Sequence, residues 1–462
     1  LPAHPALPVA RAPPEVRGRR LPAGLFAQPQ DEPIEPIRAQ VMRTLDAATD
    51  AQRERAVVRL DPAWTGAVQR EGEPAQASLC FVLASCQYVP GLVDRVPAQA
   101  SYRRLAQRLE VPAPPHKPQL LVLAGDQVYV DQTAGLFVPA GGDDVGQAYA
   151  LTFRLEALRQ VMASLPTCPL LDDHEVMDDW EPGPDPCGTP AVRAALDGYV
   201  AQQHKLVRGI GPQRDPHPFD YRMVPAGFPF YMLDTRSTRQ RRALRTDTQA
   251  APLDQAAIRA GADMGDLKKW LEAAPAELPK FLVSPVALFP MPRAAVFGDP
   301  AQGLGMDDWS GYPAPQRALL ELLRDTTARH VVVLSGDRHM SSVSSLWLQA
   351  PGGPVEVISV VSSGLYAPWT FVNARPDVFW LDGQVELGAV PGAFGATMVT
   401  AAVGTGNGFA VLQVERGATG HWRIGVTLDL DDGLTQCLRD LDPAGGGWTV
   451  QGPARFARKQ RL

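Results

Sequence analysis

The sequence has few cysteines, no long apolar run and no large excess of one charge. With 5 cysteines in 462 residues it cannot form a dense disulfide scaffold, and the odd number leaves at least one thiol outside any intrachain pair. A bond between Cys168 and Cys187 is an option that the sequence leaves open. The apolar runs end before the ~18 residues of a bilayer span, and the net charge of −6 predicts no basic surface for nucleic acid. We therefore expect a globular protein, taken to be a monomer, without a membrane span or a nucleic-acid partner.

The start of the sequence also lacks a visible export signal, because no positively charged stretch is followed by an apolar one. Since the chain begins with Leu1 rather than Met, the loss of such a signal stays open. Residues 1 to about 36 are rich in proline and arginine, which predicts an extended arm, and residues 37–60 predict a helix. The basic end of the chain predicts a solvated tail or a terminal helix. These features divide the chain into an N-terminal region 1–78, a main domain 79–440 and a basic tail 441–462.

Within the main domain, short apolar runs alternate with helix-like stretches, which predicts α/β layers. The runs are apolar at nearly every position, as in strands covered on both faces. The predicted strands are 79–86, 119–126, 168–175, 280–289, 330–337 and 355–364, and the predicted helices are 101–110, 150–165, 190–207 and 315–329. Two hairpins are also predicted, at 219–236 with a turn near Ala226 and Gly227, and at 408–430.

Four of the predicted strands end in side chains that can bind metal. The first ends at Cys86, the second at Asp126 with Tyr129 beyond it, the third at Asp172, Asp173, His174 and Glu175, and the fourth at Asp337 and His339. Functional groups collect at the carboxyl ends of strands in open α/β sheets. If the four strands lie side by side, one rim gathers more anionic groups than can stay together without a cation.

Each of these residues has a simpler explanation when it is taken alone. A lone cysteine is usually a small buried apolar residue, an aspartate after glycine is often a turn or helix-cap residue, and a tyrosine or histidine often serves packing. Two adjacent aspartates fit a solvated turn. The metal site is favoured because all of these residue types recur at strand ends.

The polar segments resemble, in order, the motifs of the PhoD-like alkaline phosphatase/phosphodiesterase family of calcineurin-like metallophosphoesterases. The segments are FVLASCQY, GDQVYVD, DDHEVMDDW, YMLDTRSTRQ, DDWSGYPAPQRALLELL, SGDRHMSS and SSGLYAPW, from about residue 79 to about 370. The resemblance implies a layered fold, with two central mixed β-sheets flanked by helices and a metal site at the carboxyl ends of the strands. It also implies a secreted or periplasmic location, although no twin-arginine signal stands in this chain. The small β-sandwich that often precedes the family's catalytic domain is not visible in residues 1–78.

The resemblance also distributes ligands between two metals. Asp126 takes the place of the bridging aspartate, and His174 that of the histidine near the leaving group. The superfamily's additional mid-chain ligand histidine has no match around 282–290, which leaves the second metal without imidazole. The first metal is assigned Cys86, Tyr129 and His339, and the second Asp173 and Asp337.

The donor types indicate which ions fit each position. Thiolate and phenolate together favour Fe(III) at the first position, where zinc is the alternative. Hard oxygen donors suit Ca²⁺ at the second, with Mg²⁺, Mn²⁺ or Zn²⁺ as alternatives. Four further acidic residues can act as additional metal ligands or form hydrogen bonds to the ligands. They are Asp131, Asp172, Asp178 and Asp179.

We therefore expect a metal-dependent phosphoesterase in which two metals lower the pKa of the attacking water. His174 and Asp126 are the expected catalytic residues, with His174 protonating the leaving oxygen. Arg236 and Arg338 are candidates for phosphate contact, although an ion pair of Arg236 with Asp234 is an equal alternative.

Other functions stay open at this point. They are a phospholipase D-like phosphodiesterase on the same site, a thiol hydrolase that uses Cys86 and His339, and a non-catalytic metal-binding protein. No G-x-S-x-G segment supports a serine hydrolase. The sequence does not separate monoesters from diesters, or nucleotides from phospholipids.

Overall fold

A computed structural model of the chain describes residues 77–456 except 89–93, 111–116, 132–141, 183–188, 208–218, 238, 240–263, 298–305, 369–373, 388–393, 418–419 and 443–445. The arm expected at 1–36, the helix expected at 37–60 and Cys187 lie outside the described residues. Cys168 is a buried free thiol. All described residues belong to one compact unit, Leu60–Leu462.

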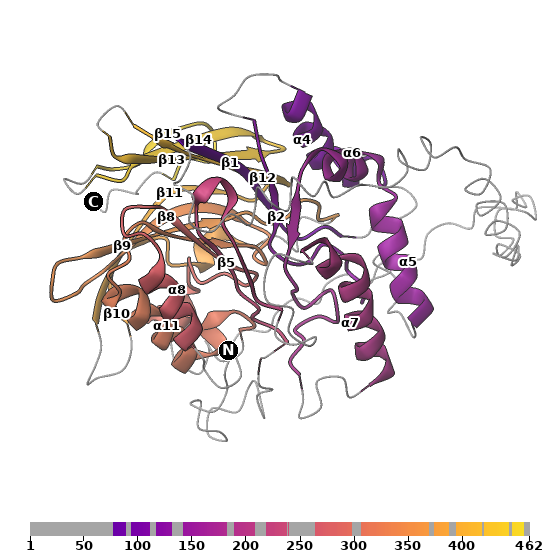
Figure 1. The fold of residues 1–462 in the computed structure, drawn as a ribbon, viewed down its shortest axis with the longest axis horizontal. Helices are drawn as coiled ribbons and strands as arrows, with labels where there is room; N and C mark the ends of the chain where they lie inside the picture. The colour runs from indigo at the N-terminus through magenta and orange to yellow at the C-terminus, as the bar shows by residue number, and fades with distance from the viewer. Residues whose placement is uncertain are drawn as a thin grey trace, which may run out of the picture. The chain divides into compact units, whose positions relative to one another are not determined.

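Two mixed β-sheets form the centre of this unit (Figure 1). As far as the chain is described, the first sheet has the order β15-β14-β13-β12-β1-β2-β3 and the second the order β10-β11-β8-β9-β7-β6-β5-β4. The first contains β1 (Ser78–Ala84), β2 (Leu121–Leu123), β3 (Thr167–Pro169), β12 (Gly408–Arg416), β13 (Trp422–Leu430), β14 (Gly433–Asp440) and β15 (Thr449–Gln451). The second contains β4 (Tyr221–Met223), β5 (Phe230–Met232), β6 (Lys280–Ser284), β7 (Val331–Ser335), β8 (Ser341–Leu348), β9 (Val355–Val361), β10 (Asp382–Leu387) and β11 (Phe394–Gly404).

The two sheets face each other across a shared core. Phe81 on β1 meets Phe230 on β5 and Phe281 on β6 edge to face, with ring centroids 5.2 and 5.1 Å apart. The alternate residues of β1, Cys80 and Val82, point to the opposite face of the sheet and pack with helix residues. Because β1 is covered on both faces, its sequence is apolar at nearly every position.

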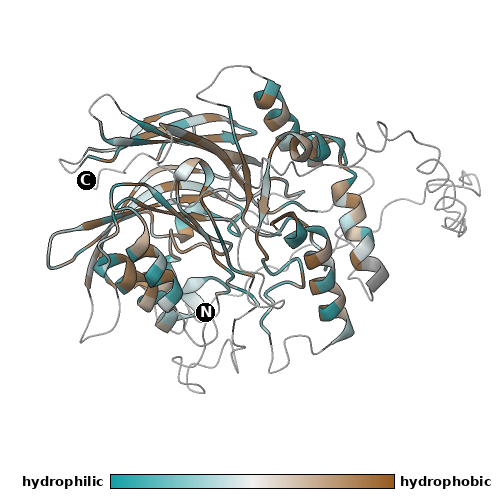
Figure 2. Cartoon of the chain, viewed as in Figure 1, coloured by the Kyte–Doolittle hydropathy of each residue, from teal (hydrophilic) through white to brown (hydrophobic). Residues whose placement is uncertain are grey.

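Helices cover the outer faces of the sheets. The helices α4 (Ala100–Glu110) and α6 (Glu156–Ser164) pack on the first sheet, and α8 (Met264–Ala273) and α11 (Pro313–Asp325) pack on the second. The helices α5 (Gly142–Phe153) and α7 (Pro190–Gln202) lie side by side, and α9 (Arg293–Phe297) is short. Figure 2 shows hydrophobic and hydrophilic residues on the same helices, as expected for a helix with one buried face. These layers confirm the expected architecture of two mixed sheets flanked by helices.

One predicted helix, 150–165, is in fact two. The chain leaves α5 at Arg154 and starts α6 after Leu155, whose backbone is extended with φ −61° and ψ 121°. Leu155 is fully buried among the residues that join α6 to the first sheet. Because Leu155 is buried in an extended conformation, the helix is interrupted there. Two helices therefore form where the apolar pattern of the sequence predicts one.

The hairpins expected at 219–236 and 408–430 are present as the antiparallel pairs β4–β5 and β12–β13. The expected tail, in contrast, begins inside the fold, because β15 pairs with β14 and the Ala454 carbonyl accepts from the Val403 N–H at 2.8 Å. Residues 457–462 lie outside the described part. Among the described residues, no helix combines the length and apolarity needed to cross a bilayer.

Candidate metal centre

The candidate site lies where the ends of the two sheets meet. Strands β1, β2 and β3 are parallel neighbours in the first sheet, so Cys86, Asp126 and Asp172 follow adjacent strands. The fourth strand, β7, belongs to the second sheet. Three of the four strands are therefore neighbours, and the fourth reaches the site from the facing sheet.

Close backbone contacts join the sheets at this point. The Ser85 hydroxyl donates to the Ser362 carbonyl at 3.0 Å, and the Ser362 hydroxyl donates to the Leu83 carbonyl at 2.9 Å. At Gly336, directly after β7, an added Cβ would lie 2.4 Å from Ser85 Oγ and 2.6 Å from the Ala124 carbonyl oxygen. Only glycine therefore lets the end of β7 approach the ends of β1 and β2 so closely.

Four of the expected site residues have left-handed backbone conformations. The φ angles are 58° at Cys86, 56° at Asp126, 68° at Asp337 and 48° at His339. Such angles cost about 1–3 kcal/mol each for residues other than glycine and cluster at functional sites. The sharp turns they produce direct side chains from strand ends into one place.

The residues expected around the first metal are in mutual contact. Asp126 Oδ2 lies 3.4 Å from Cys86 Sγ and 3.4 Å from the Tyr129 hydroxyl, which lies 3.2 Å from His339 Nε2. All four side chains are buried. Within the described residues, His339 Nδ1 is buried without a hydrogen-bond partner. One thiol, one phenol, one carboxyl and one imidazole thus converge, as the sequence predicts.

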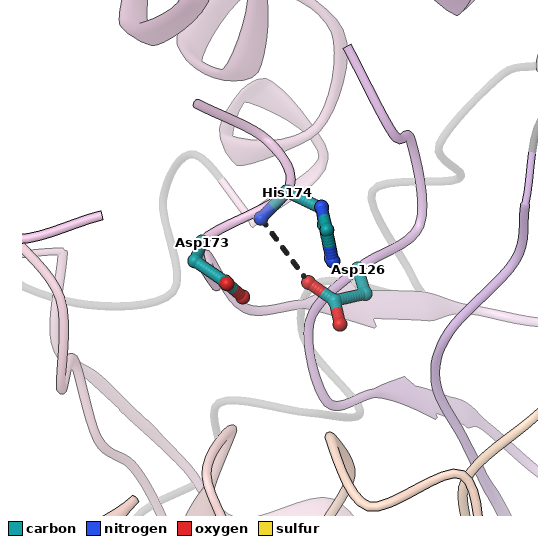
Figure 3. Close-up of side chains that lie close together, drawn as sticks. All are labelled: Asp126, Asp173 and His174. Atoms are coloured by element: carbon teal, nitrogen blue, oxygen red, sulfur yellow. Dashed lines mark hydrogen bonds between the residues drawn. The ribbon is translucent and has the colours of Figure 1, made fainter. Parts of the chain in front are cut away.

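The other oxygen of Asp126 faces the loop after β3. Figure 3 shows Asp173 and His174 approaching Asp126, and the His174 N–H donates to Asp126 Oδ1 at 3.4 Å. Ligand atoms of Asp126, Asp173 and His174 lie within 4.8 Å of one another, and Asp173 forms a second such group with Asp178 and Asp179. The two oxygens of Asp126 therefore face two different sets of donor groups.

Burial and crowding of like charges make these groups hold their protons when no cation is bound. Burial, and then the neighbouring Cys86 and Asp173, raise the pKa of Asp126 well above its usual range. Burial raises the pKa of Cys86 to about 11 against the hydrogen bonds from Ser363 and Ser85. Burial and Asp173 raise the pKa of Asp337 to about 7 although Arg338 opposes the shift. A cation that replaces these protons relieves the same repulsion, so the donor set fits bound metal.

His174 has a different electrostatic environment. Burial alone would lower its pKa, but Asp173 and the hydrogen-bonded Asp131 raise it to about 10. Asp131 Oδ2 lies 2.8 Å from His174 Nδ1, and Asp131 is itself held by the Asp178 N–H at 2.7 Å. Sequence reasoning had identified Asp131 only as a spare acid, whereas the structure makes it the partner of His174.

The structure gives Arg236 a role that differs from the expected phosphate contact. Its side chain is fully buried and binds Asp172, with Nη2 lying 3.2 Å from Asp173 and 2.5 Å from Asp307. The contact with Asp234, the alternative partner, is made by the backbone, since Asp234 Oδ1 accepts the Arg236 N–H at 2.9 Å. Arg236 therefore stabilises the carboxylates of the site through buried ion pairs. Its electrostatic attraction lowers the pKa of Asp173 against the effect of burial.

Arg338 is paired with Asp308 and lies over the Phe379 ring, with its side chain 10% exposed. Its contact with phosphate stays a prediction.

One further residue of the site was missed by sequence reasoning. The Ser363 hydroxyl donates to Cys86 Sγ at 3.1 Å and accepts the His339 N–H at 2.7 Å, so it links two expected ligands from the two sheets. The segment SSGLYAPW contains Ser363, but a serine carries no pattern that distinguishes this role from solvation. Tyr129 also stacks between Tyr88 and His174, with centroids 4.0 Å away on each side.

Comparison with known proteins agrees with this geometry. A sequence model described as PhoD-like phosphatase matches residues 81–370. Among solved structures, one titled "Structure of PhoD" has a TM-score of 0.57 at 14% sequence identity, covering 85% of this chain and 74% of that chain. No curated protein matches the chain. The structural likeness concerns the fold, and the sequence match covers every residue that the two sheets bring to the centre.

Proposed function

Because this chain belongs to the PhoD-like phosphatase family, we propose that it hydrolyses phosphate esters with metal ions held at the centre around Asp126. The observation that carries the proposal is the placement of the two Asp126 oxygens. Oδ2 faces Cys86 and Tyr129, and Oδ1 faces the loop of Asp173 and His174. A carboxylate between two groups of donors is the arrangement that two metal ions share.

The proposed ligands are Cys86, Tyr129 and His339 on one side of Asp126, and Asp173 and Asp337 on the other. Fe(III) is proposed for the first position because thiolate and phenolate are combined there, and Ca²⁺ for the second because its donors are hard oxygens. Bound ions would supply charge to the phosphate oxygens and lower the pKa of a water for attack on phosphorus.

His174 is proposed to protonate the leaving oxygen. Asp131 binds Nδ1, which orients the ring, and Nε2 lies 3.7 Å from the exposed Asp178 carboxylate, which a substrate would replace as its neighbour. Asp173 and Asp131 raise the pKa of His174 to about 10 against the effect of burial, which favours the protonated ring that this step needs. The stack of Tyr88, Tyr129 and His174 limits rotation of the ring.

The geometry weighs against a thiol hydrolase. A nucleophilic cysteine needs a thiolate and access to substrate, whereas Cys86 is fully buried and its pKa is raised to about 11. In addition, the Cys86 thiol donates to Asp126 and not to His339.

The test is metal analysis combined with a substrate screen. Purified protein is assayed with nitrophenyl phosphate, bis-nitrophenyl phosphate and a phosphatidylcholine before and after treatment with a calcium-selective chelator. We expect activity on at least one ester, its loss on chelation and its return with Ca²⁺. Unchanged turnover after chelation would show that no labile essential ion is held by Asp173 and Asp337. Which substrate responds decides between monoesterase, diesterase and phospholipase D-like activity.

A further inference from the structure

Glu175 directly follows His174 and is not among the proposed ligands. Its carboxylate nevertheless accepts five hydrogen bonds. It is fully buried. Oε1 accepts the N–H groups of Gln127 at 2.6 Å and Val128 at 3.3 Å. Oε2 accepts those of Asp126 at 3.0 Å and Asp172 at 3.0 Å. The Gln203 side chain adds a fifth donor to Oε1 at 3.1 Å.

These donors come from two turns that carry proposed metal ligands. Three are consecutive N–H groups of the turn after β2, which contains Asp126, and one is at Asp172 on the turn after β3, next to Asp173. In the turn after β2, Gly125 and Asp126 have φ angles of 85° and 56°. A turn of this kind can direct successive N–H groups into one concavity that binds an anion. Here the protein fills that concavity with its own carboxylate.

We propose that Glu175 is a positioning residue that clamps the turn of Asp126 to the turn of Asp172 and Asp173 and so sets the distance between the carboxylates that hold the metal ions. The inference rests on the proposed function, since it concerns the same centre. It assigns Glu175 no contact with substrate or metal. The residue acts through the backbone of its neighbours, whose left-handed conformation at Asp126 needs an external restraint.

The chemistry of the clamp requires a carboxylate. Both of its oxygens accept, and together they face five N–H donors. Glutamine has the same shape, but its amide nitrogen is a donor and would face other donors. In glutamine the nitrogen faces either Gln127 and Val128 or Asp126 and Asp172, so two backbone bonds of the clamp are lost in either orientation while the volume of the side chain is kept.

The first test uses protein from which metal has been removed, so it does not depend on activity. Amide hydrogen exchange is compared for wild type, Glu175→Gln and the control Glu156→Gln, which changes an exposed residue on α6. We expect exchange at Asp126, Gln127 and Val128 to be faster by on the order of tenfold or more in Glu175→Gln only. Unchanged protection at these three amides would overturn the inference.

The second test measures what the clamp does for the centre. Titration of the metal-free protein with Ca²⁺, with the melting temperature recorded alongside, should show an affinity about 10–100-fold lower for Glu175→Gln. The expected kinetic signature is a fall in kcat with little change in KM, and partial recovery in Glu175→Asp. A lower melting temperature with full Ca²⁺ affinity and full kcat would mean that Glu175 serves folding alone.

If Glu175→Gln does not fold, Glu175→Asp carries both tests, because it keeps the charge but withdraws the oxygens by one methylene. Faster exchange and weaker Ca²⁺ binding are again expected, and wild-type values for both would overturn the inference. A wild-type protein that hydrolyses no phosphate ester would refute the proposed function and leave the exchange experiment valid. An active enzyme with unchanged exchange in Glu175→Gln would refute only the clamp.

Discussion

At the scale of single residues, Asp126 has the most demanding position, because its two oxygens face separate donor groups. Asp126→Asn removes the charge and replaces one acceptor with a donor, so we expect metal to be lost and kcat to fall by several orders of magnitude. Elemental analysis and kinetics on the same sample check this. Asp197→Asn, at an exposed position of α7, is the control. Near-normal turnover with full metal content in Asp126→Asn contradicts a shared carboxylate.

A second residue-scale prediction concerns colour. A phenolate or thiolate on Fe(III) gives charge-transfer absorption in the visible, whereas zinc has a filled d shell. We expect concentrated protein to be coloured, Tyr129→Phe to weaken or shift the band, and Cys86→Ser to shift it differently. A visible spectrum with metal analysis of the same preparation provides the check. A colourless, fully active enzyme with one zinc and no iron removes the Fe(III) proposal and leaves phosphoester hydrolysis standing.

The identity of the side chains around Asp126 was predictable from the sequence, because each follows an apolar run. The roles of Arg236, Asp131 and Ser363 were not. An arginine that binds phosphate and one that binds three carboxylates look the same in sequence, and only its complete burial distinguishes them. Left-handed backbone at Cys86 was likewise unpredictable, since cysteine is not among the residue types enriched in that conformation.

At the scale of elements, the contact of β7 with β1 and β2 depends on Gly336. Gly336→Ala places a Cβ against Ser85 and the Ala124 backbone, and overpacking of this kind costs about 1–3 kcal/mol. We expect lower unfolding free energy and weaker metal binding, because the turn of Asp337 and His339 is displaced. Denaturant titration measures the first and metal titration the second. Gly352→Ala is the control, since an added Cβ there meets no atom within 4 Å. If Gly336→Ala and Gly352→Ala have equal unfolding free energies, the end of β7 does not depend on glycine to approach β1 and β2.

Away from the site the two sheets have another link, between Arg439 on β14 and Glu356 near the start of β9. The pair is bidentate at 3.1 and 2.9 Å, and Arg439 is 3% exposed. Arg439→Met leaves a largely buried carboxylate without its cation, so we expect a loss of about 3–5 kcal/mol. Denaturant titration should show that the further change Glu356→Leu recovers most of it. Arg423→Met, which breaks the exposed pair with Asp440, should cost within about 1 kcal/mol. If Arg439→Met and Arg423→Met lose similar amounts of unfolding free energy, the pair of Arg439 and Glu356 does not link the sheets as proposed.

Element by element, the sequence predicts strands well where the buried residues are apolar and poorly where they are polar. It predicts no strand at β8, whose sequence SSVSSLWL is rich in serine. The serine hydroxyls are nevertheless buried, and Ser344 pairs with Thr400 on β11 at 3.0 Å. Nor can the sequence distinguish one sheet from two, because apolar strands read alike whichever partner they pair with. For this reason the strand pattern alone does not show that β7 lies in the other sheet from β1 to β3.

At the scale of the whole molecule, His330 at the start of β7 links folding to pH. Burial, and then Lys280, Arg329 and His421, lower its pKa to about 4 from an ordinary value of 6.5. The unfolded chain therefore takes up this proton first, and stability is lost as pH falls from 6.5 towards 4. Denaturant midpoints at several pH values in this window should fall less steeply for His330→Asn, because asparagine does not titrate and tolerates the φ of 59° found there. If the midpoints of wild type and His330→Asn fall equally steeply with pH, His330 does not contribute to the pH dependence of stability.

The pairing of β1 with β12 sets the order in which the protein can assemble during synthesis. Ser78 lies opposite Glu415, so one edge of β1 has no strand to bind until residues far along the chain have left the ribosome. At about 5–20 residues per second, this edge waits for on the order of tens of seconds. The neighbours β2 and β3 emerge early, so the half of the centre with Cys86, Asp126 and Asp173 exists before the half with Asp337 and His339. An unpaired apolar strand of this kind is an aggregation hazard, and the nascent protein is therefore expected to depend on chaperones until its last strands are made.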